Sequence, residues 1–404
     1  MHILYIYFFY KNKFIYTLLL LNFIFIIIIN KNNKKKIFVI DRYVPNFNKD
    51  AGGRCTFMYL KLFNELGLKV TFLGADFENP EPYTTILQQN GIKVLYGNKL
   101  KKNIIKWFSH CLRYYNFVYL QRPSIALKYL EIIRNFFSGK IIFFGHDLHY
   151  IRLLREYKLK HDEKYKKLSE IFKKKEMDIF SRVDIIHVVG NYEQNILKEK
   201  FHNKSIRNIP IYIYETQLNN VEKDFSKRNG IIFVGGFSHS PNVDAVLWFI
   251  NDIFPKITKK YPDIIFHIVG SNIPRKIMRF QSENIKIEGF LSDEDLKLMY
   301  GKCRIAVAPL RYGAGVKGKI VEAAYNQIPI ITTSLGAEGL DSSIGAFLVE
   351  DNPEKMADLI CKLYFDFSNL KKLSDSGKIF IEKYFSVKKA KEELMKDIND
   401  KNVK

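Results

Sequence analysis

A glycine-punctuated segment in the second half of the chain carries residue types that suit anion binding. The stretch from Cys303 to Thr333 reads as an apolar run, a loop containing Gly313 and Gly315, a segment with helical spacing and a second apolar run. This order predicts a strand–loop–helix–strand unit whose loop lies at the carboxyl ends of the strands. Glycines in such a loop allow positive φ and let the backbone approach a ligand closely.

Two lysines and a glutamate follow these glycines. Lys317 and Lys319 fall at the expected start of the helix, where free N–H groups and the helix dipole already favour an anion. A lysine gains nothing from the dipole at that end, so a phosphate between the lysines and the backbone explains them better than solvent does. Glu322, one turn further, would accept hydrogen bonds from hydroxyl groups such as those of ribose. The alternative is an ordinary turn with solvated lysines, and the loop alone leaves both interpretations open.

The elements that must position this loop alternate between strands and helices along the chain. KIFVID (36–41) and KVTFLG (69–74) read as strands separated by a helical segment. A polar stretch at 215–229 precedes a second series, which begins with GIIFVGG at 230–236. Such alternation predicts parallel, doubly wound sheets.

The segment PLRYGAGVKGKIVEAAYNQIPIITT resembles the nucleotide-sugar motif of retaining GT-B glycosyltransferases of family 4, the glycosyl transferases group 1. Many members carry two glutamates separated by seven residues. Glu322 matches the second, and Ala314 stands where the first would be. A subgroup instead has Arg-x-Gly-x-Gly-x-Lys-x-Lys, which matches Arg311, Gly313, Gly315, Lys317 and Lys319. The resemblance implies that this loop binds a nucleotide diphosphate.

Positions in the first half of the chain match the family as well. Gly52 and Gly53 follow the first strand, and the resemblance implies that their backbone approaches the donor's phosphates or sugar. The next residue, Arg54, replaces a usually small residue and would add a charge. His146 ends a later strand, where the family has a histidine at the sugar-transfer centre, and His149 is the second choice. If the resemblance is set aside, the glycine pair suits a plain tight turn. His146 then suits a histidine that is only hydrogen-bonded to a nearby carbonyl group.

The resemblance assigns roles to the following residues. The predicted catalytic residues are His146 and Glu322. The predicted donor-binding residues are Gly52, Gly53, Gly235, Gly236, His239, Asn242, Gly289 and Phe290 (these two beside the base), Arg311, Gly313, Gly315, Lys317, Lys319 and Glu322. Many members carry Arg and Lys in the loop where this chain has His239 and Asn242, so the phosphate charge here must come more from Lys317 and Lys319.

The implied fold is α/β GT-B, in which two Rossmann-like, doubly wound parallel-sheet domains face a central cleft. The predicted boundaries are a hydrophobic N-terminal segment (1–35), an acceptor domain (36–214), a linker (215–229), a nucleotide-sugar domain (230–385) and a C-terminal helix (386–404) that crosses back to the first domain. A length of 404 residues with 47% hydrophobic residues suits two domains with sizeable cores.

The N-terminal segment has three interpretations. Phe14–Ile29 is apolar except for Thr17 and Asn22, and a bilayer span needs about 20 residues, so the run is marginal. Lysines are more frequent after the run than before it, which would keep the rest of the chain on the cytoplasmic side. A membrane anchor and a dispensable extension remain open. A signal peptide is disfavoured because no small-residue cleavage site follows.

The net charge of +22 predicts anionic partners: nucleic acid, phosphate ligands or anionic lipid. Residues 152–178 form a lysine-rich helical segment that either lies on an anionic membrane surface or is a solvated helix face. The four cysteines are scattered without a Cys-x-x-Cys pair, which suits a reducing compartment and offers no zinc site. No metal or other cofactor is expected beyond the donor nucleotide sugar.

These features predict a glycosyltransferase that uses a nucleotide-diphosphate sugar and a glycan, lipid or other acceptor, in cell-surface polysaccharide or glycoconjugate synthesis. Retention follows from the resemblance alone, and we expect a location on the cytoplasmic side, anchored to the membrane or peripheral. A basic nucleic-acid-binding protein is an alternative, but no base-reading motif is recognisable. An NAD-dependent oxidoreductase would carry Gly-x-Gly-x-x-Gly after the first strand, and this chain does not have that motif there. A further alternative is a catalytically inactive subunit that binds a sugar nucleotide, and only an activity assay would distinguish it from the enzyme.

Overall fold

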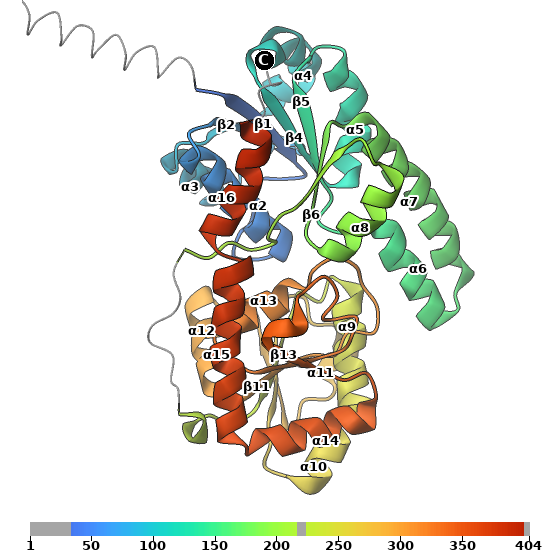
Figure 1. The fold of residues 1–404 in the computed structure, drawn as a ribbon, viewed down its shortest axis with the longest axis vertical. Helices are drawn as coiled ribbons and strands as arrows, with labels where there is room; N and C mark the ends of the chain where they lie inside the picture. The colour runs from blue at the N-terminus through green and yellow to red at the C-terminus, as the bar shows by residue number, and fades with distance from the viewer. Residues whose placement is uncertain (1–33, 216–223, 400–404) are drawn as a thin grey trace, which may run out of the picture.

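The computed structural model describes residues 34–215 and 224–399, which form two α/β domains, one above the other in Figure 1. Each domain is built on one parallel sheet. The first has seven strands in the order β3-β2-β1-β4-β5-β6-β7, and the second has six in the order β10-β9-β8-β11-β12-β13. The predicted fold class is confirmed. The apolar N-terminal run lies outside the described residues, and within the described ranges no helix is long and apolar enough to cross a membrane.

The first domain alternates strands and helices from residue 36 to residue 208. Its strands are β1 (Lys36–Asp41), β2 (Lys69–Gly74), β3 (Lys93–Leu95), β4 (Phe117–Gln121), β5 (Lys140–Phe144), β6 (Ile185–Val188) and β7 (Ser205–Asn208). Its helices are α2 (Ala51–Glu65), α3 (Tyr83–Gln89), α4 (Asn98–Cys111), α5 (Pro123–Arg134), α6 (His149–Lys160), α7 (Glu163–Arg182) and α8 (Asn191–Lys200). All five residues of β4 are buried, as expected for a central strand covered on both faces.

The second domain repeats the pattern from residue 231 onward. Its strands are β8 (Ile231–Val234), β9 (Phe266–Val269), β10 (Ile285–Gly289), β11 (Ile305–Ala308), β12 (Ile330–Thr332) and β13 (Phe347–Val349). Its helices are α9 (Ser240–Trp248), α10 (Phe254–Lys260), α11 (Arg275–Met278), α12 (Asp293–Lys302), α13 (Gly318–Tyr325), α14 (Pro353–Tyr364) and α15 (Phe367–Tyr384), and α16 (Val387–Ile398) follows.

The chain crosses between the domains twice, and the two crossings lie side by side. The backbone N–H of Tyr214 donates to the carbonyl oxygen of Phe385 at 2.9 Å. Figure 1 shows α15 alongside the second domain and α16 alongside the first. There Asp397 of α16 accepts hydrogen bonds from His187 of β6 and Arg207 of β7. A cluster of buried apolar side chains also continues from β1 to β12, so the domains share part of one core.

Two elements differ in detail from their sequence patterns. The lysine-rich segment 152–178 is divided between α6 and α7, because His161 adopts a left-handed conformation and Asp162 then caps α7 by accepting from the N–H of Lys164. The helix after the glycine loop begins at Gly318, two residues later than its apolar pattern, because Lys317 is extended and serves as the N-cap residue.

Candidate active site

The glycine loop between β11 and α13 lies against the first domain. Gly313 has φ 153° and Gly315 has φ 69°, conformations that favour glycine. A Cβ on Gly315 would lie 3.0 Å from the carbonyl oxygen of His146 and 3.2 Å from the Cβ of Asp147. A side chain at Gly315 would therefore push the loop away from the first domain. The fold brings two predicted parts of the site, the loop and His146, together across the domain interface.

Lys317 is a buried ammonium surrounded by carboxylates. Its Nζ donates to the carbonyl oxygen of Gly315. Burial lowers the pKa of Lys317 to about 8, while Glu338, Glu193 and Asp147 act in the opposite direction. These acidic side chains therefore offset part of the cost of burying the charge of Lys317.

Lys319, in the first turn of α13, has a neutral partner instead. Its Nζ lies 2.5 Å from Oδ1 of Asn242 and 4.9 Å from the ring centroid of Phe233. Burial, together with the nearby Lys317, lowers the pKa of Lys319 to about 7, while Glu322 acts in the opposite direction. An ammonium in this environment is poised to bind an anion, because burying an uncompensated charge is unfavourable.

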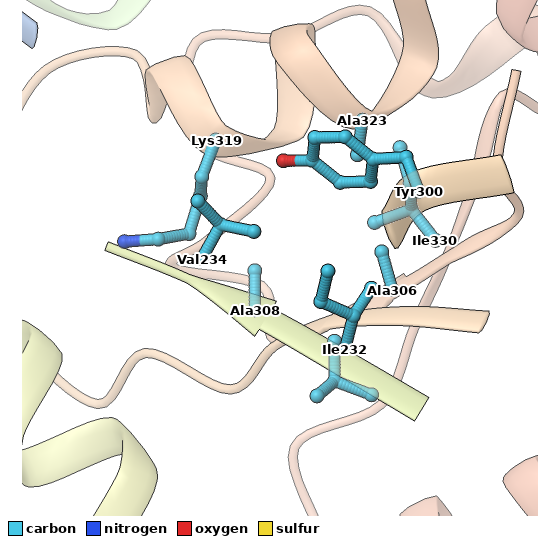
Figure 2. A pocket seen from close by; sticks show the side chains of 9 residues that line it. Ile232, Val234, Tyr300, Ala306, Ala308, Lys319, Ala323 and Ile330 are labelled. Atoms are coloured by element: carbon cyan, nitrogen blue, oxygen red, sulfur yellow. The ribbon is translucent and has the colours of Figure 1, made fainter. Parts of the chain in front are cut away.

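Where the Lys319 side chain faces the sheet, its neighbours are mostly apolar. Figure 2 shows its side chain leaving α13 and ending near the tip of the strand that carries Ile232 and Val234. The side chain borders a cavity of about 10 Å³, which is too small for a ligand. This cavity therefore offers no room for a ligand of Lys319.

The loop between β8 and α9 fixes Asn242. The side-chain amide of Asn242 donates to the carbonyl oxygen of Gly236 at 2.7 Å, and its Oδ1 accepts from Lys319. A Cβ on Gly235 would lie 2.9 Å from the same amide nitrogen. The neighbouring His239 precedes α9, and burial lowers its pKa to about 4. His239 is therefore neutral at physiological pH and contributes hydrogen bonding rather than charge.

Glu322 of α13 also reaches the domain interface. Its Oε1 lies 2.5 Å from Nη1 of Arg54, and its Oε2 lies 3.4 Å from the hydroxyl of Tyr300. Burial raises the pKa of Glu322, while the guanidinium of Arg54 lowers it. The pair joins the first turn of α2 to α13 of the second domain.

His146 follows β5 with a left-handed backbone, φ 63°. Its Nε2 lies 3.0 Å from Oε1 of Gln121, and its ring centroid lies 4.3 Å from that of Phe144. Because the amide oxygen is an acceptor, the hydrogen-bond network places the proton on Nε2 and leaves Nδ1 as an acceptor. Burial and the nearby Arg122 lower the pKa of His146 to about 3, so the ring is neutral.

The glycine pair begins α2, where the side chain of Asp50 accepts from the N–H of Gly53 at 2.7 Å. A Cβ on Gly52 would lie 2.7 Å from Nη2 of Arg122. The guanidinium of Arg122 pairs with Asp41, with Nε 2.6 Å from Oδ1. A side chain at position 52 would therefore force the guanidinium of Arg122 to move away from the start of α2.

The other predicted donor residues lie at two places. Arg311 pairs with Asp244 at 2.9 and 2.6 Å over the ring of Trp248, so it faces α9 rather than the lysines. Gly289 and Phe290 line an open groove of about 510 Å³ at the carboxyl ends of β9 and β10, and Phe290 is 52% exposed.

Sequence reasoning missed two arginines of this interface. Arg122 lies beside the glycine pair. Arg155 of α6 donates to the carbonyl oxygen of Gly313 at 2.8 Å and forms a bidentate pair with Glu338 at 2.8 and 2.5 Å. Neither belongs to a recognisable motif. Arg122 directly follows the buried strand β4 and precedes Pro123, which was the one available signal.

Residues 228–366 match the family described as glycosyl transferases group 1. A protein of the cps region of Klebsiella pneumoniae is 29% identical over 176 residues, 41% of this chain and 45% of the relative. A glycosyltransferase of Methanocaldococcus jannaschii, described as uncharacterized, is 28% identical over 229 residues, 52% of this chain and 60% of the relative. The chain thus spans about half the length of the curated relatives it matches.

Solved structures resemble the whole fold. Sucrose-phosphate synthase from Thermosynechococcus elongatus aligns with a TM-score of 0.68 at 14% identity, covering 91% of this chain and 98% of that one. The HepE protein of Anabaena, in complex with UDP-glucose, aligns with a TM-score of 0.62 at 13% identity, covering 90% and 99%. At these identities the likeness establishes the two-domain fold alone.

Proposed function

We propose that this chain, whose residues 228–366 belong to the glycosyl transferases group 1, transfers a sugar from a nucleotide-diphosphate sugar to an acceptor between its two domains. The observation that carries the proposal is Lys319, a buried ammonium with a neutral partner at the amino end of α13. A phosphate would supply the missing counter-charge, and the helix N–H groups would bind the same anion.

The donor would extend from the loop to the groove. The diphosphate binds Lys317, Lys319 and the backbone at Gly313 and Gly315, and the ribose hydroxyls donate to Glu322. The base then lies in the groove lined by Gly289 and Phe290, where the exposed Phe290 ring offers a stacking face. UDP is the nucleotide we favour, since the structurally similar HepE protein binds UDP-glucose.

The reacting sugar would lie beside His146. This neutral ring presents Nδ1 as a hydrogen-bond acceptor, because Nε2 is held by Gln121. It therefore orients a sugar hydroxyl rather than delivering a proton. Negative charge that develops on the departing diphosphate is stabilised by Lys317, Lys319 and the α13 N–H groups, so the transfer requires no metal ion. We further propose that the anomeric configuration is retained, as in the family.

The acceptor would bind the first domain. We propose a glycan or lipid-linked acceptor in the synthesis of cell-surface polysaccharide or glycoconjugate, because one relative is encoded in a cps region. The hairpin α6–α7 projects from the first domain in Figure 1 and carries exposed Leu168 and Ile171 among lysines. We propose that this face lies on an anionic membrane, on the cytoplasmic side where nucleotide sugars are made.

Thermal-shift measurements on the full chain test the donor assignment. We expect one or more of a panel of nucleoside-diphosphate sugars to stabilise the protein, by about 2.7 kcal/mol at a concentration one hundred times its Kd. The stabilising sugar nucleotide is then tested for transfer to lipid and glycan acceptors. A protein that no nucleotide sugar stabilises, yet that binds DNA in a salt-sensitive manner, would refute the proposal.

A further inference from the structure

One side chain of the first domain, Arg54, contacts two helices of the second. It lies directly after the glycine pair in α2, and its side chain is 21% exposed. Nη1 lies 2.5 Å from Oε1 of Glu322 in α13, and Nη2 lies 2.5 Å from Oδ1 of Asp293 in α12. The planar fork of a guanidinium suits two carboxylates at once, which an ammonium does less well.

The contact with Arg54 favours the charged form of Glu322. The titratable groups that face it are Arg54 from α2, Asp293 and Tyr300 from α12, Lys319 from its own helix, and Tyr212 and Tyr214 from the segment after β7. Burial and Asp293 raise the pKa of Glu322, and Arg54 lowers it. A buried glutamate without its cation takes up a proton instead.

The same region joins the domains. The ring of Tyr212 lies 2.9 Å from the position a Cβ would take at Gly318, the first residue of α13. The ring of Tyr214 stacks on Tyr325 at the other end of that helix, with centroids 3.8 Å apart. The crossing segment therefore holds both ends of α13, and Arg54 adds a contact from α2 near its middle.

We propose that Arg54 is a positioning residue for the donor, which holds the carboxyl group of Glu322 in place for the ribose and ties the first domain to the second at that point. This inference rests on the proposed function for its ligand. It goes beyond that function because it makes ribose recognition depend on a residue of the opposite domain. The donor site is then complete only when the two domains are closed.

The experiment compares donor binding and turnover in wild type, Arg54→Ala, Arg54→Lys, Glu322→Gln and the Arg54→Ala/Glu322→Gln double variant. We expect Arg54→Ala to raise the donor KM about 10- to 100-fold. Little further loss is expected in the Glu322→Gln background, because Arg54 acts through Glu322. The ratio of the Arg54→Ala KM to the wild-type KM should shrink as pH rises, because a Glu322 without its cation is ionised more fully at higher pH. Arg54→Lys should bring the KM part of the way back to the wild-type value and make this ratio less dependent on pH.

A second readout needs no nucleotide. Arg54→Ala should open the domains, which small-angle scattering of the full chain detects as a larger radius of gyration, whereas the exposed-arginine control Arg113→Ala should not. An Arg54→Ala protein with wild-type KM and dimensions, or with an equal loss in both Glu322 backgrounds, overturns the inference. A wild-type protein that binds no nucleotide sugar refutes the proposed function instead, and scattering still tests the tie between the domains.

Discussion

The ammonium nitrogen of Lys319 and Oδ1 of Asn242 lie 2.5 Å apart, although 77 residues separate them in the chain. Lys319 lies in the first turn of α13 and Asn242 in the first turn of α9, so the pair brings two helix N-termini together at the carboxyl ends of the central strands β8 and β11. The positive ends of two helix dipoles therefore face the same space, beside an ammonium that has no ion pair with a carboxylate among the described residues.

Replacing Lys319 by alanine should weaken donor binding about 10- to 100-fold, because a charge-assisted hydrogen bond to phosphate is lost. Isothermal titration with the donor or with UDP measures the effect. Lys297→Ala, an exposed lysine of α12, is the matched control and should bind like wild type. Wild-type affinity in Lys319→Ala would remove the phosphate clamp from the proposal.

Donor binding to wild type should also take up protons near neutral pH. Since the pKa of Lys319 is about 7 in the empty site, part of the population must gain a proton when the diphosphate binds. Affinity should therefore fall as pH rises from 7 to 9, and titrations in buffers of different ionisation enthalpy should show net proton uptake. Lys319→Ala should lose most of this linkage, and an unchanged linkage would contradict the assignment.

Lys319→Met should stabilise the empty protein while it impairs binding. The pKa of Lys319 is lower in the folded than in the unfolded protein, so its buried charge lowers the free energy of unfolding. This destabilisation is greatest below pH 7 and disappears as the pH rises toward the unfolded pKa of about 10.4. Denaturant unfolding at pH 6 should show a gain of roughly 1–4 kcal/mol for the variant, shrinking by pH 9. A gain that is independent of pH would point to packing rather than charge.

The strands and the glycine loop were predictable because their signals are local. β1 and β2 are short apolar runs, and the loop combines glycines with a βαβ pattern. The break in the lysine-rich helix at His161 was missed, since a left-handed histidine leaves no mark on an amphipathic pattern. Some elements also begin or end a few residues away from the predicted positions, because cap residues such as Lys317 leave no mark on the apolar pattern either.

The pairs across the interface were not predictable. Arg155 with Glu338, and Arg54 with Glu322, join residues from opposite domains, and their contact depends on how the two sheets face each other. Sequence reasoning noticed Arg54 as an added charge but gave it no partner. Single charged residues outside motifs carry no information on such pairing, because most lie on solvated surfaces.

His146→Asn should lower kcat about 100-fold and leave UDP affinity unchanged, because in the proposed arrangement the ring orients the sugar and does not bind the nucleotide. Asparagine tolerates the φ of 63°, so the backbone should persist. His161→Asn, at a second left-handed histidine with φ 55°, is the matched control and should keep full activity. With a pKa of about 3, His146 should give no inflection in kcat between pH 5 and 8.

Gly315→Ala should impair turnover through a contact rather than through backbone strain alone. Gly345 has nearly the same φ, 68° against 69°, but a Cβ there would meet nothing within 4 Å. Both substitutions should therefore cost about 1 kcal/mol of stability from the left-handed conformation. Only Gly315→Ala should also displace the loop from His146 and reduce kcat/KM. Equal activities in the two variants would show that the loop does not need its contact with the first domain.

Reversing the charge of the α7 face should release the protein from anionic vesicles. Lys167, Lys174 and Lys175 are exposed on this helix beside Leu168 and Ile171, which are 40% and 47% exposed. Each lysine near an anionic surface contributes about 1 kcal/mol, so replacing all three by glutamate should weaken binding by at least roughly 100-fold.

The control for this surface carries the same change on α10, as Lys256, Lys259 and Lys260 replaced by glutamate, because these lysines are equally exposed but lie in the second domain. Sedimentation of the full chain with phosphatidylglycerol and phosphatidylcholine vesicles separates the two variants. If net charge alone drives association, both variants lose binding equally. If the apolar run 14–29 is sufficient, neither loses it. Only selective loss in the α7 variant supports a defined membrane face, since the electrostatic attraction falls off within a Debye length of the surface.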